Sequence, residues 1–120
     1  MRATFFASKL LAVLPSPGGD GKSINMKAEL IARERLWLAD GVKVEIVVWR
    51  LPRALPGSQH RFKYRLALVS HGLCVLRYDN EAGKGDHKHV DEREVPYRFI
   101  DLDTLQADFK ADVETWIAGR

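Results

Sequence analysis

The sequence is poor in cysteine and contains no long hydrophobic run. Among its 120 residues there is one cysteine, Cys74, so no disulfide can form within the chain and nothing indicates an oxidising compartment. No segment approaches the roughly 20 consecutive apolar residues that span a bilayer. We therefore expect no membrane association. Cys74 lies in an alternating apolar run, where we expect a small core residue.

Residues 1–25 lack the features of a signal peptide and of a nucleotide-binding loop. Polar residues interrupt the apolar stretch, and no small-residue cleavage site follows it. The segment GGDGKS resembles a P-loop, but that pattern requires glycine five positions before Gly21, where this chain has Ser16. We expect residues 1–25 to be a flexible extension outside the domain, and residues 26–120 to form one domain.

Charge is unevenly distributed along the chain. The formal net charge is +3, yet residues 27–77 carry ten Lys or Arg and four Asp or Glu, whereas residues 78–120 carry six and eleven. A basic first half indicates an anionic partner such as nucleic acid. An ordinary mixed-charge surface is the alternative.

Alternating apolar residues predict a first β-hairpin. Residues 42–48 alternate between apolar and more polar side chains, which is typical of a strand with one buried face. A preceding strand over residues 27–38 joins it through a three-residue loop in which Gly41 is left-handed, and this register places Leu36 opposite Val44. The segment KAELIARERL also has helical propensity, which is the competing interpretation.

A second hairpin is predicted over residues 61–80, with Ser70-His71-Gly72 as a three-residue loop. One face of this hairpin is apolar and carries Phe62, Tyr64, Leu66, Leu68, Cys74, Leu76 and Tyr78. The opposite face carries Lys63, Arg65, Arg77 and Asp79. Its cations, together with Arg98, are candidate RNA-binding residues, and ordinary solvent-facing strand residues are the alternative.

The C-terminal segment predicts an amphipathic helix. Its apolar residues recur at three- and four-residue spacing, namely Leu102, Leu105, Phe109, Val113 and Trp116. Asp103 and Gln106 have the spacing of a capping box, and Gly119 indicates the end of the helix. Tyr97 and Phe99 alternate before it and predict a short edge strand. The expected architecture is α+β: an antiparallel β-meander of four to five strands with a C-terminal amphipathic helix packed on one face.

The stretch YDNEAGKGDHKHVDE, residues 78–92, is the densest in ionisable groups. Gly83 and Gly85 flank Lys84, an arrangement that allows the backbone to approach a phosphate while the ammonium adds charge. His87 and His89 are two residues apart, so in an extended segment both rings point to one side, with backbone positions about 6.6–6.8 Å apart. Two imidazoles of this kind can act as general base and general acid in metal-free RNA cleavage.

We therefore take Lys84, Asp86, His87 and His89 as candidate catalytic residues, with no metal and no cofactor. Two alternatives stay open at this point. The two histidines with Asp86 and Asp91 form a possible site for zinc or manganese. The stretch is otherwise a polar loop in which Asp86 caps turn amides.

The same residues resemble a known family. YDNEAGKGDHKH, followed by YRF and an acidic amphipathic helix, is similar to the TumE family of small bacterial and archaeal proteins, which are toxin components of toxin–antitoxin systems. The similarity continues upstream through MKAEL, DGVKVEIVVWRLP and PGSQHRFKYRL, and so covers about residues 26–117. It implies a cytoplasmic toxin that is neutralised by a cognate helix-turn-helix antitoxin.

The resemblance brings no settled catalytic residue set, and a likeness to small toxin ribonucleases rests on fold analogy alone. RNA or the ribosome is the expected target. The candidate RNA-binding set comprises the four cations named above together with motif residues, namely Lys63, Arg65, Arg77, Tyr78, Gly83, Gly85 and Arg98. A non-catalytic module that binds RNA or protein through the basic sheet face is the alternative function, and a metal-dependent nuclease is another.

Overall fold

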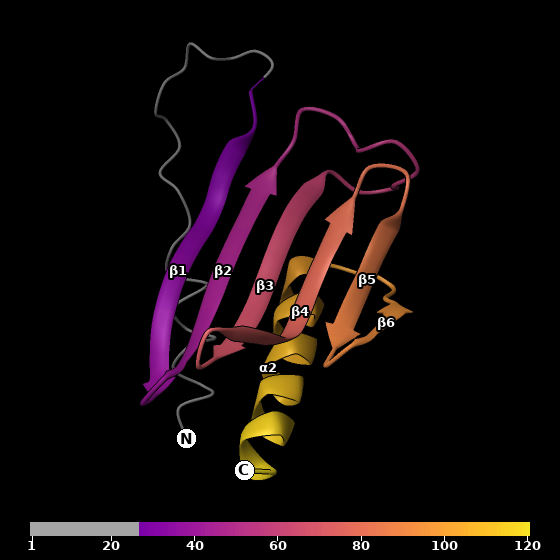
Figure 1. Cartoon of the computed structure of the whole chain (residues 1–120). Helices are drawn as coiled ribbons and strands as arrows, with labels where there is room; N and C mark the ends of the chain where they lie inside the picture. The colour runs from indigo at the N-terminus through magenta and orange to yellow at the C-terminus, as the bar shows by residue number, and fades with distance from the viewer. Residues whose placement is uncertain (1–26) are drawn as a thin grey trace.

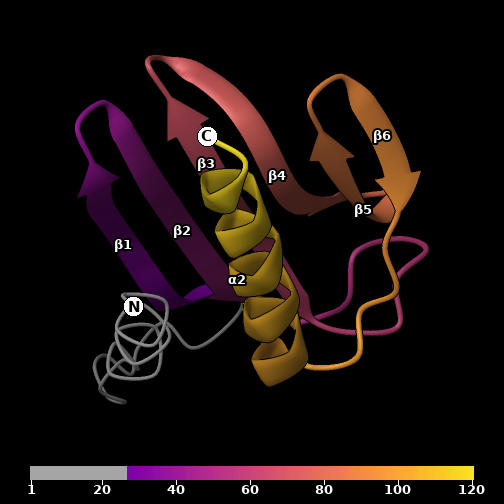
Figure 2. The same ribbon diagram turned by 90° about the horizontal axis from the view of Figure 1, so that it is seen from below.

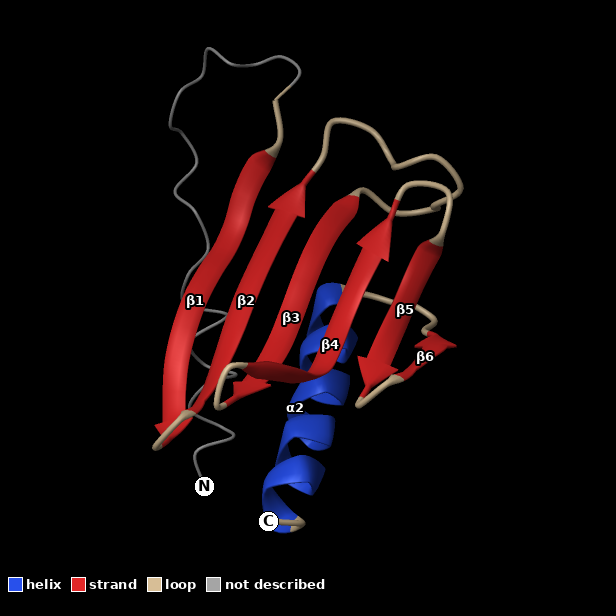
Figure 3. Cartoon of the chain, in the orientation of Figure 1, coloured by secondary structure: helices blue, strands red, loops and turns tan. Residues whose placement is uncertain are grey.

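One antiparallel sheet and one helix make up the part of the chain that the computed structural model describes, residues 27–120 (Figures 1 and 3). Each strand pairs with the next along the chain, as a meander requires. The strands are β1 (Glu29–Ala39), β2 (Val42–Arg50), β3 (Phe62–Ser70), β4 (Leu73–Glu81), β5 (Gly85–Val90) and β6 (Arg93–Pro96), and the helix is α2 (Leu102–Ala118). The predicted extension, residues 1–25, lies outside the described residues.

The α+β meander is confirmed, but the sheet has six strands where four to five were predicted. The difference arises in residues 78–92, which are no loop. The turn occupies only residues 82–84, and β5 then pairs with β4 and β6. This segment is polar on both sides, so it lacks the apolar alternation by which a strand is recognised. The predicted edge strand at Tyr97 and Phe99 is also wrong, because β6 ends at Pro96.

The helix α2 covers one side of the sheet (Figure 2). The predicted stripe is confirmed: Leu105, Phe109 and Val113 are buried against strand residues, and Leu102 and Trp116 pack at the margin of this core. The cap differs from the prediction, because Asp101 rather than Asp103 accepts the hydrogen bond from the Thr104 N–H at 2.7 Å. No helix within residues 27–120 is long and apolar enough to cross a membrane.

In the first hairpin Leu36 pairs with Val44, as predicted, and Gly41 has a φ of 75°. The turn is shorter than expected, because Ala39 already pairs with Val42 and the register shifts at Leu38. The helical alternative for this segment is thereby excluded.

The second hairpin has a two-residue turn, because Ser70 pairs directly with Leu73. Both turn residues have positive φ, 49° at His71 and 85° at Gly72, as in the type I′ turns that match strand twist. The register shift in this hairpin pairs Cys74 with Val69, on the side of the sheet away from α2, where Cys74 is exposed. The prediction that Cys74 is a core residue is therefore wrong.

Gly41→Ala should lower the free energy of unfolding by about 1–2 kcal/mol, because alanine is strained at this positive φ. A Cβ on Gly41 would also lie 2.5 Å from the His71 imidazole, which must move aside. Gly119→Ala is the matched control, since Gly119 has a φ of −86° and room for a Cβ. Urea unfolding measures both variants, and equal midpoints would contradict a conformational requirement at Gly41.

Candidate functional site

The face of the sheet opposite α2, which we call the open face, carries the site. It faces the viewer in Figure 1, where α2 lies behind the strands. Two neighbouring rows of paired residues cross it from β3 or β4 to β5 or β6, namely Arg65, Asp79 and His87 in one row and Arg77, His89 and Glu94 in the other. Because side chains alternate along a strand, all six project to this face.

His87 is the most enclosed of these residues, with 4% of its surface exposed. Its Nδ1 lies 3.2 Å from the carbonyl oxygen of Gly85, and its Nε2 lies 2.9 Å from Asp79 Oδ1 and 3.5 Å from Glu94 Oε2. A carbonyl oxygen only accepts hydrogen bonds, so Nδ1 carries a hydrogen and donates it. The other ring nitrogen, Nε2, is the one that faces the carboxylates of Asp79 and Glu94.

The Asp79 side chain, on β4, contacts His87 of β5 on the open face. Its Oδ2 accepts a hydrogen bond from Arg77 Nε at 3.0 Å, while Oδ1 faces His87. Although Oδ1 is close to His87 Nε2, this contact lacks hydrogen-bond geometry, and within residues 27–120 the buried oxygen has no hydrogen-bond donor. The Asp79 carboxylate therefore forms a hydrogen bond with the Arg77 guanidinium but none with the His87 imidazole.

His89 stands edge-on to His87, with ring centroids 5.2 Å apart and ring planes at 71°. The two rings share one side, as the two-residue spacing predicted. Burial, followed by the neighbouring Arg77 guanidinium, holds the pKa of His89 below its ordinary value. Its Nε2 is buried, and no other described residue provides it with a hydrogen-bond partner.

Glu94 on β6 completes the group, and sequence reasoning missed it. Its Oε2 lies 2.8 Å from Lys84 Nζ, 3.5 Å from His87 Nε2 and 4.0 Å from His89 Nε2. The hydrogen bond with Lys84 lowers the pKa of Glu94 and raises that of Lys84. We call Asp79, His87, His89 and Glu94 the His–carboxylate cluster. The signal for Glu94 was a third hairpin in HKHVDEREV, which polar residues obscured.

Asp86, a predicted catalytic residue, is not part of this cluster. It lies on the α2 side of the sheet, because it alternates with His87 along β5. There its Oδ2 accepts a 2.6 Å hydrogen bond from the Tyr64 hydroxyl and a 2.9 Å hydrogen bond from His60 Nε2. Burial and then this hydrogen bond raise the pKa of Tyr64. The sheet separates Asp86 from His87 and His89.

The other predicted residues are likewise divided between the open face and the α2 side of the sheet. Tyr78 is 1% exposed on the α2 side, where its hydroxyl donates to Asp112 Oδ2 at 2.6 Å. Lys63 Nζ donates to the carbonyl oxygen of Asn80 at 2.6 Å, and Arg98 is exposed between β6 and α2. The structure brings together Lys84, Arg77, His87 and His89, whereas Tyr78 lies apart from the open face.

Gly83 and Gly85 shape the turn that carries Lys84. Their φ values are 77° and 83°, which glycine adopts without strain. The Gly83 N–H donates to the carbonyl oxygen of Pro56 at 2.9 Å, so the irregular connection between β2 and β3 supports this turn. The turn thereby places the Gly85 carbonyl against His87.

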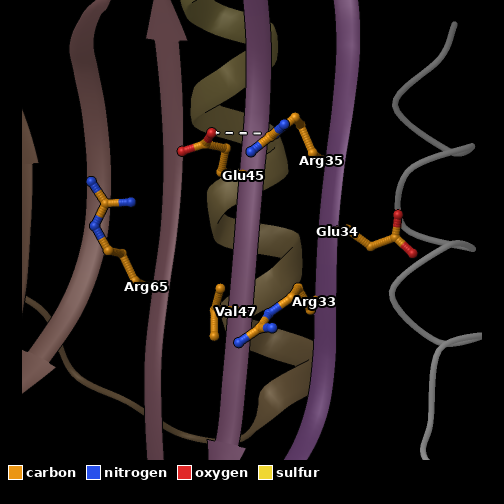
Figure 4. Close-up of a pocket in the computed structure, with 6 residues that line it drawn as sticks. All are labelled: Arg33, Glu34, Arg35, Glu45, Val47 and Arg65. Carbon is orange, nitrogen blue, oxygen red and sulfur yellow. Dashed lines mark ion pairs between the residues drawn. The ribbon is translucent and has the colours of Figure 1, made fainter.

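A groove of about 380 Å³ lies farther along the open face, over β1, β2 and β3 (Figure 4). It is lined by Arg33, Glu34, Arg35, Glu45, Val47 and Arg65. Arg35 pairs with Glu45 at 3.5 Å, while Arg33 lies over the Trp49 ring at 5.9 Å. Trp37, which does not line the groove, is 63% exposed, and the Lys43 Nζ lies over its ring at 5.3 Å from the centroid. Cations that alternate with aromatic rings in this way suit a single-stranded polyanion with stacking bases.

Part of the His–carboxylate cluster also has the donors of a metal site. Asp79, His87 and His89 each offer one ligand atom, and these atoms lie within 4.8 Å of one another. The predicted ligands Asp86 and Asp91 are not in this group. Imidazole nitrogens with a carboxylate oxygen are the donors that bind zinc and related transition metals.

Fold and site together define a small α+β domain whose basic open face carries histidines and carboxylates at one end. The family model described as Toxin TumE matches residues 22–117, which is four fifths of the chain. The protein belongs to the TumE toxin family, and this membership implies an antitoxin partner. Comparison with curated proteins and with solved structures gave no significant match.

Proposed function

We propose that this TumE family toxin is an endoribonuclease of the cytoplasm that binds and cleaves RNA on its open face. The observation that carries the proposal is the position of His87 and His89 beside Arg77 and in line with Arg65, at one end of a basic surface. Such a surface attracts the phosphate backbone, and the histidines provide groups that can transfer protons.

In the metal-free form of this reaction, the RNA 2′-oxygen forms a bond to the adjacent phosphorus as the bond to the 5′-oxygen breaks. His89 accepts the 2′ proton, because its lowered pKa keeps it neutral at neutral pH. His87, with a hydrogen already on Nδ1, donates a proton to the departing 5′-oxygen when it is doubly protonated. Arg77 and Lys84 flank the cluster and offset the negative charge on phosphorus.

A metal-dependent nuclease is the second form, favoured by the convergence of ligand atoms from Asp79, His87 and His89. In either form the groove over β1–β3 holds the RNA strand upstream or downstream of the cut. We further propose that an acidic segment of a helix-turn-helix antitoxin silences the toxin by lying across Lys63, Arg65 and Arg77, which blocks access of RNA.

Expression of the chain should arrest growth and fragment cellular RNA, and coexpression of the cognate antitoxin should restore growth. Purified protein should cleave RNA, alone or on ribosomes, and its RNA affinity should fall steeply as salt rises. Gel analysis of RNA with and without ribosomes checks this result. RNA that stays intact under both conditions would exclude the ribonuclease function, while salt-sensitive binding without cleavage would favour the passive RNA-binding module.

A further inference from the structure

We infer that Asp79, His87 and His89 form a binding site for one divalent transition metal ion, for which zinc is the best match. The inference deepens the proposed ribonuclease function, because it identifies a cofactor for the same site. Three features of the described residues support it: the tautomer of His87, the unsatisfied atoms around it, and the chemistry of the donors.

The tautomer of His87 is set by its backbone contact. Since Nδ1 donates to the Gly85 carbonyl, the neutral ring presents a lone pair on Nε2, and this lone pair faces the carboxylates of Asp79 and Glu94. The nitrogen lone pair and the carboxylate oxygens repel each other unless a proton or a metal cation lies between them. A histidine that donates one N–H to a backbone carbonyl while its other nitrogen faces acidic oxygens has the arrangement of a metal ligand.

His60 shows that this arrangement is not a general property of histidine–aspartate pairs in this fold. Its Nε2 lies 2.9 Å from Asp86 Oδ2, the same separation as between His87 and Asp79. However, His60 Nδ1 accepts a hydrogen bond from the Phe62 N–H at 3.1 Å, so Nε2 carries the hydrogen. The neutral ring is satisfied at both nitrogens, and no cation is needed.

Two further atoms of the site are buried without hydrogen-bond partners within residues 27–120, namely Asp79 Oδ1 and His89 Nε2. Asp79 is 9% exposed, and its other oxygen already accepts from Arg77. Unsatisfied buried polar atoms are rare and require an explanation such as an ion. Here the two atoms belong to the same group of convergent donors as His87.

The donor set indicates which class of metal binds. Two imidazole nitrogens and one carboxylate oxygen favour zinc or a similar transition metal over magnesium or calcium, which prefer oxygen. Three protein ligands leave a fourth position for water, as in catalytic zinc sites. Glu94 lies beside these donors, because its Oε2 is within 4.0 Å of Nε2 in both histidines and 2.8 Å from Lys84 Nζ.

The test is zinc binding by the purified full-length chain, measured by elemental analysis after dialysis and by calorimetric titration of Zn²⁺ into chelator-treated protein. We expect one ion per chain. His87→Gln and Asp79→Asn should each weaken binding more than about 100-fold, since even loss of residues that only orient ligands costs 10–100-fold. His71→Asn and Asp91→Asn are controls that remove an exposed imidazole and an exposed carboxylate, and both should bind as the wild type does.

Nitrogen NMR of the wild-type imidazoles makes the test independent of whether the variants fold. Zinc should shift the Nε2 signals of His87 and His89 and leave those of His60 and His71 in place. Absence of binding by folded protein, or binding that leaves these two signals unchanged, would overturn the inference. RNA cleavage that persists in excess chelator without bound ion would refute zinc as the cofactor of cleavage and keep the ribonuclease, whereas zinc binding without any RNA cleavage would keep the metal site and refute the ribonuclease.

Discussion

Replacing His89 with glutamine is expected to lower RNA cleavage at least about 100-fold and to abolish growth arrest. His89 Nε2 makes no hydrogen bond within the described residues, so the substitution breaks no hydrogen bond made by this atom. The loss follows whether His89 transfers a proton or binds a metal ion, because glutamine does neither effectively at this position. Single-turnover cleavage of a labelled RNA measures the effect, and an unchanged melting temperature shows that the fold is retained.

His71→Asn is the matched control for this substitution. It removes an exposed imidazole from a turn residue with a φ of 49°, a conformation that asparagine tolerates. Arg65→Ala provides the contrast in binding: it should weaken RNA affinity and reduce the slope of the salt dependence by about one, with the cleavage step kept. If His89→Gln stays fully toxic while Arg65→Ala loses binding and toxicity together, the protein is a binding module and not a nuclease.

Phe109→Ala is expected to lower the free energy of unfolding by about 3–5 kcal/mol. Phe109 has no exposed surface and lies edge-on to Tyr78, with ring centroids 5.7 Å apart, at the centre of the contact between α2 and the sheet. Domains of this size are stable by only about 5–15 kcal/mol, so the loss leaves little stability. Chemical unfolding measures it.

Glu114→Ala, on the exposed side of α2, is the control and should change the stability by less than about 0.5 kcal/mol. A Phe109→Ala variant as stable as this control would show that α2 is not the principal cover of the sheet. Because toxicity requires the folded sheet, Phe109→Ala should also reduce toxicity, together with a lowered unfolding midpoint. His89→Gln should lose toxicity without that change.

Local sequence patterns sufficed for most of the fold. Strands β2, β3 and β4 alternate between apolar and polar side chains, and a one-residue slip would bury charges such as Arg65, so their faces follow from the sequence. The three- and four-residue spacing from Leu102 to Trp116 likewise determined which side of α2 meets the sheet. The register at turns was less predictable, because bulges at Leu38 and Val75 depend on the turn geometry and redirected Cys74.

For the site, the sequence determined that His87 and His89 share one side, since that follows from the period of an extended chain. It did not determine that the segment is a strand, because polar residues on both of its faces conceal the pattern. Only the paired sheet decided that Asp86 belongs to the opposite side and that Asp79 and Glu94 meet the histidines. Asp79, His87 and Glu94 lie on three different strands, and no local pattern encodes distances between strands. Pairing across the tertiary structure therefore created the His–carboxylate cluster from residues whose individual chemistry the sequence already contained.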